Sequence, residues 1–274
     1  MIAFNNILTY ILTVFYFVTV WVYAKAFFKS NQLAKKIKSP FLYTTLGLHG
    51  FYLMYRTLLF DHPPITTVFE IMSIIAFSIT LAYAVIEYNT KVKDTGYFIL
   101  TLSFFFQLFS TLFIENLNEV KPILRNNLLG LHVSSALIGY SAFAIAAVYG
   151  FLYLMLYHDI KSKHFGVIYN KLPDLEQLER MTSIANIVGF ILLTVAIIVG
   201  VVWLPKAFGS IFYSDPKLIG TLCIWGMYAL GFTAKKIVGW HGKKIMILSI
   251  IGFAVSFFSL TIINIYFSGF HKFY

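Results

Sequence analysis

The sequence predicts an all-α integral membrane protein, a bundle of about eight transmembrane helices with both termini outside. Composition gives the first reason: of 274 residues, 59% are hydrophobic and only 12% are charged, and the mean hydropathy is +0.80. A soluble domain of this size needs more charge to cover its surface. The second reason is a series of apolar stretches of about 20 residues, the length that crosses a bilayer as a helix. We expect residues 1–274 to form a single transmembrane domain.

Eight apolar segments follow one another along the chain. They lie near residues 5–28, 41–60, 66–86, 96–114, 127–157, 183–204, 217–234 and 245–267. The fifth is longer than a bilayer requires, so we expect it to tilt or to project into water. No Lys or Arg precedes the first apolar run, which favours an uncleaved first span over a signal peptide.

The distribution of positive charge predicts the orientation. Fifteen of the 21 Lys and Arg residues fall in the loops on one side and five on the other, and Arg56 lies within the second segment. Since basic loops stay on the cytoplasmic side, both termini are expected on the outer side of the membrane. The expected location is the inner (plasma) membrane of a cell. The formal charge of +10 therefore indicates the orientation of the chain in the membrane and not a nucleic-acid binding surface. The expected partner is membrane lipid.

Two histidines are expected at the outer ends of their segments. His132 lies about one turn into the fifth segment, and His271 follows the last one. A helix N-terminus disfavours a charged imidazolium, so His132 should be neutral, the form that binds iron. Each histidine also has a plainer interpretation: His132 could bond a neighbouring helix, and His271 could be an interfacial residue of the tail.

An aromatic loop at residues 203–217 lies between these histidines in the sequence. It carries Trp203, Phe208, Phe212 and Asp215. If all of these share one outer face, they form a candidate site for a flat, apolar, metal-containing ligand, of which haem is the obvious example. The alternative is an ordinary aromatic belt, with Asp215 capping the seventh segment and Pro216 at its first helical position.

A second cluster of polar residues falls inside the apolar segments. His49 and Arg56 lie on one face of the second segment, and Glu70 near the start of the third is the natural partner for Arg56. Glu70 also completes a capping box with Thr67, so a structural role stands beside that of a second site. These three residues could also belong to a solute transporter, but the sequence shows none of the matched repeats that are typical of that class.

The outer loop carries a family resemblance. The stretch Phe208-Gly209-Ser-Ile-Phe212-Tyr-Ser214-Asp215-Pro216-Lys217 resembles the motif Trp-Gly-x-x-Trp-x-Trp-Asp-Pro-Lys of the CcsA/ResC-type cytochrome c assembly proteins. The segments around His49 to Glu70, Leu131-His132, Gly239 to Lys244 and Gly269-Phe270-His271 are similar too. The resemblance implies that His132 and His271 are axial ligands of haem b. It also implies a ResB-like partner and apocytochrome c as the acceptor.

Two departures point to a branch of that family. Phe208, Phe212 and Ser214 stand where the motif has tryptophans, and Thr233 stands where the family has a membrane-embedded histidine. These differences resemble the HemX branch, which is associated with control of haem biosynthesis through glutamyl-tRNA reductase. Haem presentation at the outer face and HemX-like regulation are therefore both expected functions. Neither assigns a catalytic residue to this chain, although it could form part of a cytochrome c haem lyase complex.

Overall fold

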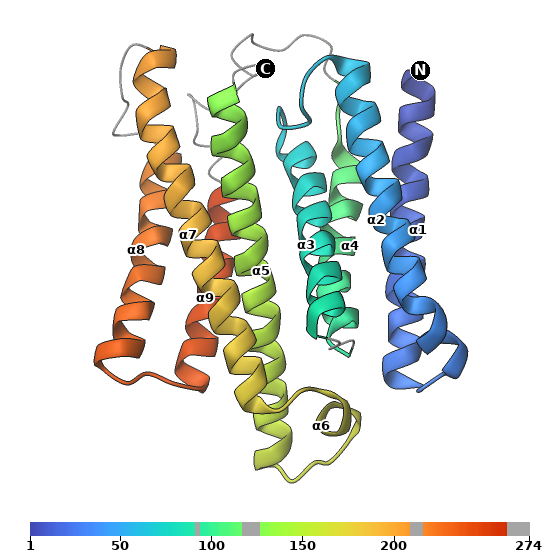
Figure 1. Ribbon diagram of the computed structural model, residues 1–274, viewed down its shortest axis with the longest axis vertical. Coiled ribbons are helices and arrows are strands. Elements are labelled where there is room, and N and C mark those ends of the chain that lie inside the picture. The colour runs from blue at the N-terminus through green and yellow to red at the C-terminus, as the bar shows by residue number, and fades with distance from the viewer. Residues whose placement is uncertain (91–93, 117–126, 209–215, 262–274) are drawn as a thin grey trace. The chain divides into compact units, whose positions relative to one another are not determined.

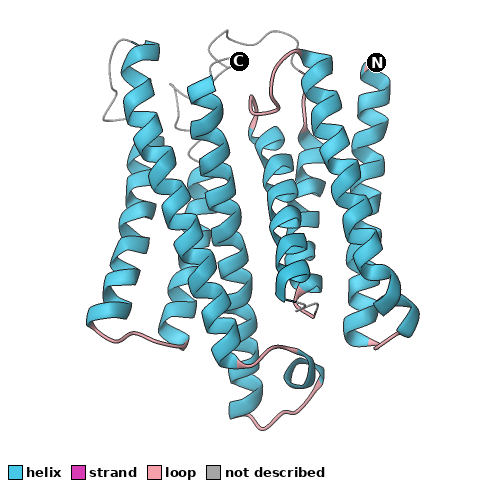
Figure 2. Cartoon of the chain, in the orientation of Figure 1, coloured by secondary structure: helices cyan, strands magenta, loops and turns pink. Residues whose placement is uncertain are grey.

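The computed structural model describes residues 1–90, 94–116, 127–208 and 216–261, with the side chains of residues 127 and 203–208 left out. Within these residues the chain forms helices and contains no strand (Figures 1 and 2). Seven of the helices are long and apolar enough to cross a membrane. They are α1 (Ile2–Phe28), α3 (Val68–Thr90), α4 (Gly96–Phe113), α5 (Asn127–Lys161), α7 (Leu175–Phe208), α8 (Pro216–Ile237) and α9 (Lys243–Phe258). The prediction of an all-α, multi-pass membrane protein is confirmed.

The predicted second span, 41–60, belongs to α2 (Gln32–Phe60), which is less apolar than the others. This helix of 29 residues includes three lysines near its start as well as His49 and Arg56. It begins earlier than expected because the Asn31 side chain accepts a hydrogen bond from the Ala34 amide, 3.0 Å away, and so caps the helix. In the described part of the chain, the seven helices above match seven of the eight predicted spans. Helix α2, which packs along α1, corresponds to the remaining predicted segment but is not apolar enough to be counted with them (Figure 1).

The chain divides into two compact units. Unit 1, residues 1–120 and 170–173, is built from α1 to α4. In it α1 packs against α2 and α4, and α3 packs against α4 and α2. Leu8, Leu12, Tyr16 and Tyr52 form a buried apolar cluster between α1 and α2. Asp61 ends α2 in the left-handed conformation, with φ of 55°, and the chain turns directly into α3.

Unit 2, residues 121–169 and 174–274, is built around α5. Buried residues make up 72% of the most apolar stretch of α5, against 17% for α8, so α5 is central and α8 peripheral. Helix α5 packs against α7 and α9, and α8 packs against α7 and α9. The short helix α6 (Val167–Lys171) interrupts the predicted loop between α5 and α7.

Glycines bring the two longest helices of unit 2 into close contact. A Cβ added at Gly139 of α5 would lie 3.2 Å from the carbonyl oxygen of Gly189 in α7, and one at Gly189 would lie 2.6 Å from the ring of Phe143. Small residues at such a crossing let helix backbones approach one another. This close approach determines which side chains of α5 reach the backbone of α7.

Candidate functional site

His132 reaches from α5 to the backbone of α7. Its Nδ1 lies 2.8 Å from the carbonyl oxygen of Ala196. Because a carbonyl oxygen only accepts hydrogen bonds, the proton must be on Nδ1, and in the neutral ring the lone pair is then on Nε2. Histidines that bind metals in proteins usually donate their second ring nitrogen in this way, which fixes both tautomer and orientation.

Gly200 makes room for that imidazole. It lies one helical turn after Ala196 on α7, and a Cβ at this position would approach the His132 ring to 2.9 Å at Cε1 and 3.0 Å at Nδ1. Real Cβ atoms do not tolerate such contacts, so the glycine is what allows the ring edge to lie against α7. Ser135 bonds the carbonyl oxygens of Leu131 and His132 within its own helix. Its hydroxyl is thereby engaged with backbone rather than with the imidazole.

The other predicted haem residues are placed less completely. His271, Asp215 and Phe212 lie outside the described residues, and for Trp203 and Phe208 the structure describes the backbone alone. The prediction that the aromatic loop opens at residue 203 is wrong, because α7 continues through Pro205 to Phe208. Pro216 does occupy the first position of α8, as expected.

The predicted pair Arg56 and Glu70 is confirmed in unit 1. Arg56 donates from Nη2 and Nε to Glu70 Oε1 at 2.7 and 3.0 Å, and both side chains are 1% exposed. Arg56 also donates to the Asn116 side chain and the Glu115 carbonyl. The other carboxylate oxygen of Glu70 accepts from the amide and hydroxyl of Thr66. The charges are thus neutralised and fully hydrogen-bonded, as buried ions require.

The capping-box prediction is confirmed as well. The Glu70 amide donates to Thr67 Oγ1 at 3.1 Å, and the Thr67 amide donates to Glu70 Oε2 at 3.4 Å. These reciprocal bonds satisfy backbone groups that the first turn of α3 would otherwise leave open. Glu70 therefore joins the start of α3 to Arg56 of α2, which is a structural role.

His49 lies at the centre of a hydrogen-bonded chain and is completely buried. Ser73 donates to Gln107 at 2.9 Å, so its oxygen accepts the Nε2 proton of His49, 3.1 Å away. The opposite nitrogen, Nδ1, then accepts from the Tyr16 hydroxyl at 2.8 Å. The chain runs on from Gln107 to Thr111 and from there to Thr13. The two ring nitrogens thus bond side chains of two other helices, α1 and α3, and Ser73 extends the chain to Gln107 of α4, an arrangement suited to holding the bundle together.

Glu87 of α3 is a buried polar group for which the sequence pattern predicts no role. It accepts hydrogen bonds from Tyr23 at 2.7 Å, Tyr83 at 2.9 Å and Ser39 at 2.5 Å. Its only sequence signal is a carboxylate near the end of an apolar segment, which does not identify hydroxyl partners on other helices. Across the described ranges no three His, Cys, Asp or Glu residues gather as a metal-binding group.

Comparison with known proteins shows the family. The model of the cytochrome c assembly protein family matches residues 65–271, which is most of the sequence and includes both candidate ligand histidines. The chain belongs to the cytochrome c assembly protein family. Its family membership supports a role in cytochrome c biogenesis, with haem handling as the general activity.

Individual relatives carry two kinds of name. The cytochrome c biogenesis protein CcsA of Guillardia theta is 27% identical over 77% of this chain and 76% of its own length. CcsA of Mesostigma viride is 24% identical over 93% of this chain and 92% of its own. Protein HemX of Brevibacillus brevis is 25% identical over 81% of this chain and 82% of its own. The family resemblance seen in the sequence is confirmed, with both names among its relatives.

Proposed function

We propose that this protein handles haem in cytochrome c assembly, holding haem b as cargo at its outer face between His132 and His271. Family membership supports the general role. The observation that carries the haem site is the hydrogen bond from His132 Nδ1 to the Ala196 carbonyl. It fixes the neutral tautomer whose Nε2 can bind iron, and Gly200 leaves the space that the ring occupies.

Each predicted residue has a task in this proposal. Two imidazoles, from His132 and His271, would fill both axial positions of the haem iron. Trp203, Phe208 and Phe212 would cover one face of the macrocycle, since aromatic rings stack on flat apolar surfaces. Asp215 would orient the haem or the incoming apocytochrome. We further propose a ResB-like partner and a location in the inner (plasma) membrane.

A second candidate function is HemX-like control of haem biosynthesis through the abundance of glutamyl-tRNA reductase. Two observations favour it: a relative named HemX covers 81% of the chain, and Phe208, Phe212 and Ser214 replace the tryptophans of the assembly motif. In that role the chain would act through a protein contact and would have no chemistry of its own.

A deletion strain separates the two functions. Membranes would be stained for covalently bound haem, and glutamyl-tRNA reductase would be measured by immunoblot, with the wild-type gene or His132→Ala restored. Loss of holo-cytochrome c that the wild type restores and His132→Ala does not supports haem handling. Normal holo-cytochrome c with a changed level of the reductase contradicts it and supports regulation.

A further inference from the structure

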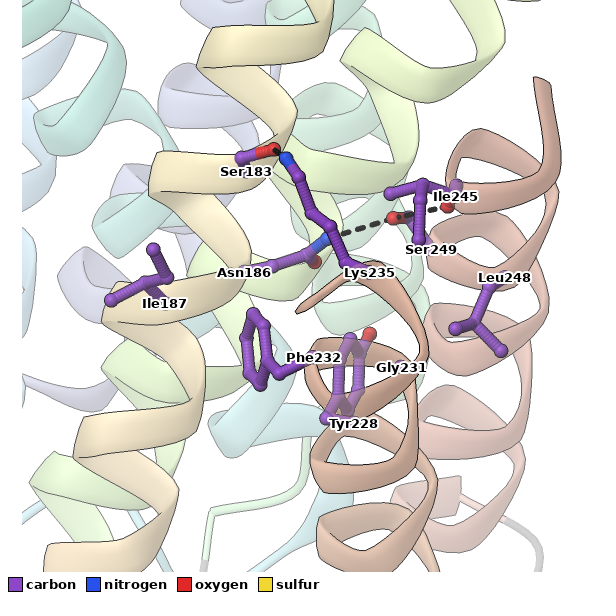
Figure 3. Close-up of a pocket in the computed structure, with 10 residues that line it drawn as sticks. All are labelled: Ser183, Asn186, Ile187, Tyr228, Gly231, Phe232, Lys235, Ile245, Leu248 and Ser249. Atoms are coloured by element: carbon purple, nitrogen blue, oxygen red, sulfur yellow. Dashed lines mark hydrogen bonds between the residues drawn. The ribbon is translucent and has the colours of Figure 1, made fainter. Parts of the chain in front are cut away.

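A cavity of about 150 Å³ lies within unit 2 between α7, α8 and α9 (Figure 3). Polar and aromatic side chains from all three helices line it, among them Ser183, Asn186, Tyr228, Phe232, Lys235 and Ser249. The cavity lies toward the end of α8 where the predicted inner loop begins. A cavity of this size, roughly 150 Å³, can hold a benzene ring in other proteins, so it accepts a group of several heavy atoms.

Two buried polar atoms in its wall have no hydrogen-bond partner among the described residues. They are Oδ1 of Asn186 and the hydroxyl of Tyr228, on side chains that are only 5% and 4% exposed. The orientation of the Asn186 amide is fixed, because its Nδ2 donates to Ser249 Oγ at 2.7 Å and Ser249 donates onward to the Ile245 carbonyl. Unpartnered buried groups are rare and point to a bound polar group.

The two atoms have complementary needs. Asn186 Oδ1 can only accept a hydrogen bond, whereas the Tyr228 hydroxyl has a proton to donate. The ring of Tyr228 is held in place by stacking on Phe143, with 3.8 Å between centroids and 7° between planes. An alcohol is both donor and acceptor, so an alcohol hydroxyl can satisfy both atoms. The remaining walls are mostly apolar, including Phe232 and Leu248.

A positive charge lies at the same cavity. Lys235 Nζ donates to Ser183 Oγ at 2.8 Å and lies 4.0 Å from Glu179, and the Lys235 side chain is 33% exposed. Lys236, Lys243 and Lys244 follow in the same predicted inner region. Basic pockets between helices on the cytoplasmic side bind the head groups of anionic lipids.

An apolar groove adjoins the cavity. It has a volume of about 630 Å³, shares Gly231 and Leu248 with the cavity, and is lined by residues such as Met227, Leu230 and Trp240. A cavity with two unpartnered polar atoms in its wall, a lysine and a neighbouring apolar groove match the three parts of a phospholipid: the head group, the phosphate and the acyl chains.

We propose that this site binds an anionic phospholipid with a polyol head group. A head-group hydroxyl lies between Asn186 and Tyr228, the phosphate pairs with Lys235, and the chains lie in the groove along α8 and α9. The proposal does not depend on the haem site, because it uses none of that site's residues.

Native mass spectrometry of the purified full chain tests the proposal. Dioleoyl phosphatidylglycerol would be compared with dioleoyl phosphatidic acid, which has the phosphate without the polyol, and with dioleoyl phosphatidylcholine, which has no net charge. We expect the phosphatidylglycerol to bind tightest and the phosphatidylcholine weakest. Tyr228→Phe, which keeps the stacked ring, and Asn186→Leu should each weaken phosphatidylglycerol binding roughly fivefold and leave phosphatidic acid unaffected.

Two lysine variants separate the phosphate contact from general surface charge. Lys235→Met should weaken the binding of both anionic lipids, whereas Lys236→Met, an exposed neighbour that does not line the cavity, should weaken neither. Equal binding of phosphatidylglycerol and phosphatidic acid would overturn the polyol assignment. Binding that survives Tyr228→Phe and Asn186→Leu unchanged would overturn the site and leave the cavity to water.

Discussion

The Nδ1 proton of His132 is donated across 2.8 Å to the carbonyl oxygen of Ala196, one turn before a glycine that leaves space for the ring. The bond joins the central helix of unit 2 to its closest neighbour. It sets the direction in which the imidazole presents Nε2. Because the acceptor is a backbone carbonyl, a different side chain at residue 196 would leave this hydrogen bond available.

Gly200→Ala should weaken haem binding without unfolding the protein. The new Cβ would lie 2.9 Å from His132 Cε1, so the ring must rotate or move away from Ala196. Disturbing the partner that orients a metal-binding histidine typically costs about tenfold or more in affinity. Haem titration followed by absorbance measures the change.

Gly130→Ala is the matched control for that experiment. It lies on the same helix as His132, and a Cβ there meets nothing within 4 Å. Its haem affinity should equal that of the wild type. Equal affinities for Gly200→Ala and wild type would show that the contact with α7 does not orient the ligand.

Removing one partner of the buried ion pair should strongly destabilise the fold. Arg56→Leu leaves the Glu70 carboxylate, 1% exposed, without its counter-charge, at a cost of about 3–5 kcal/mol. Denaturant unfolding in detergent would measure the loss. The double variant Arg56→Leu with Glu70→Leu should lose less than the sum of the two single variants, and strict additivity would argue against the pair.

His49→Leu should lower stability and leave the haem spectrum unchanged. The replacement removes the two buried hydrogen bonds of the imidazole, to the Tyr16 hydroxyl and to Ser73 Oγ, at about 0.5–1.5 kcal/mol for each. Thermal unfolding and the absorption spectrum are measured on the same sample. A changed spectrum would make His49 part of a haem site instead of a structural link.

The space around two glycines predicts opposite effects for their substitution by alanine, one at the crossing of α5 and α7 and one in α2. Gly189→Ala places a Cβ 2.6 Å from Phe143 and should destabilise unit 2 by about 1–3 kcal/mol. Gly47→Ala, where nothing lies within 4 Å, should stabilise α2 by up to about 1 kcal/mol, because alanine is the better helix former. An unfolding midpoint for Gly189→Ala at or above that of the wild type would contradict the assigned crossing.

The sequence predicted the helices well because apolar length is a strong signal in a membrane protein. It also predicted the pair of Arg56 and Glu70, since charges within apolar segments are few and need partners. Helix ends were harder to predict. The predicted segment ended at residue 204, just before Pro205, yet membrane helices tolerate proline, and α7 continues to Phe208.

Contacts between neutral groups were beyond sequence reasoning. The chain from Tyr16 through His49 to Ser73 and Gln107 joins residues on four helices, and no pairing rule connects hydroxyls with amides. The partner of His132 is a backbone carbonyl, which every residue has, so Ala196 carried no signal. Gly200 was one glycine among 17 and became informative only beside the imidazole.

The absorption spectrum of the purified protein tests the central claim most directly, with wild type measured beside His132→Ala, His271→Ala and the double variant. Two axial imidazoles predict a haem Soret band in the wild type, a shifted or weakened band in each single variant, and no band in the double variant. A Soret band that survives replacement of both histidines would contradict the proposed site.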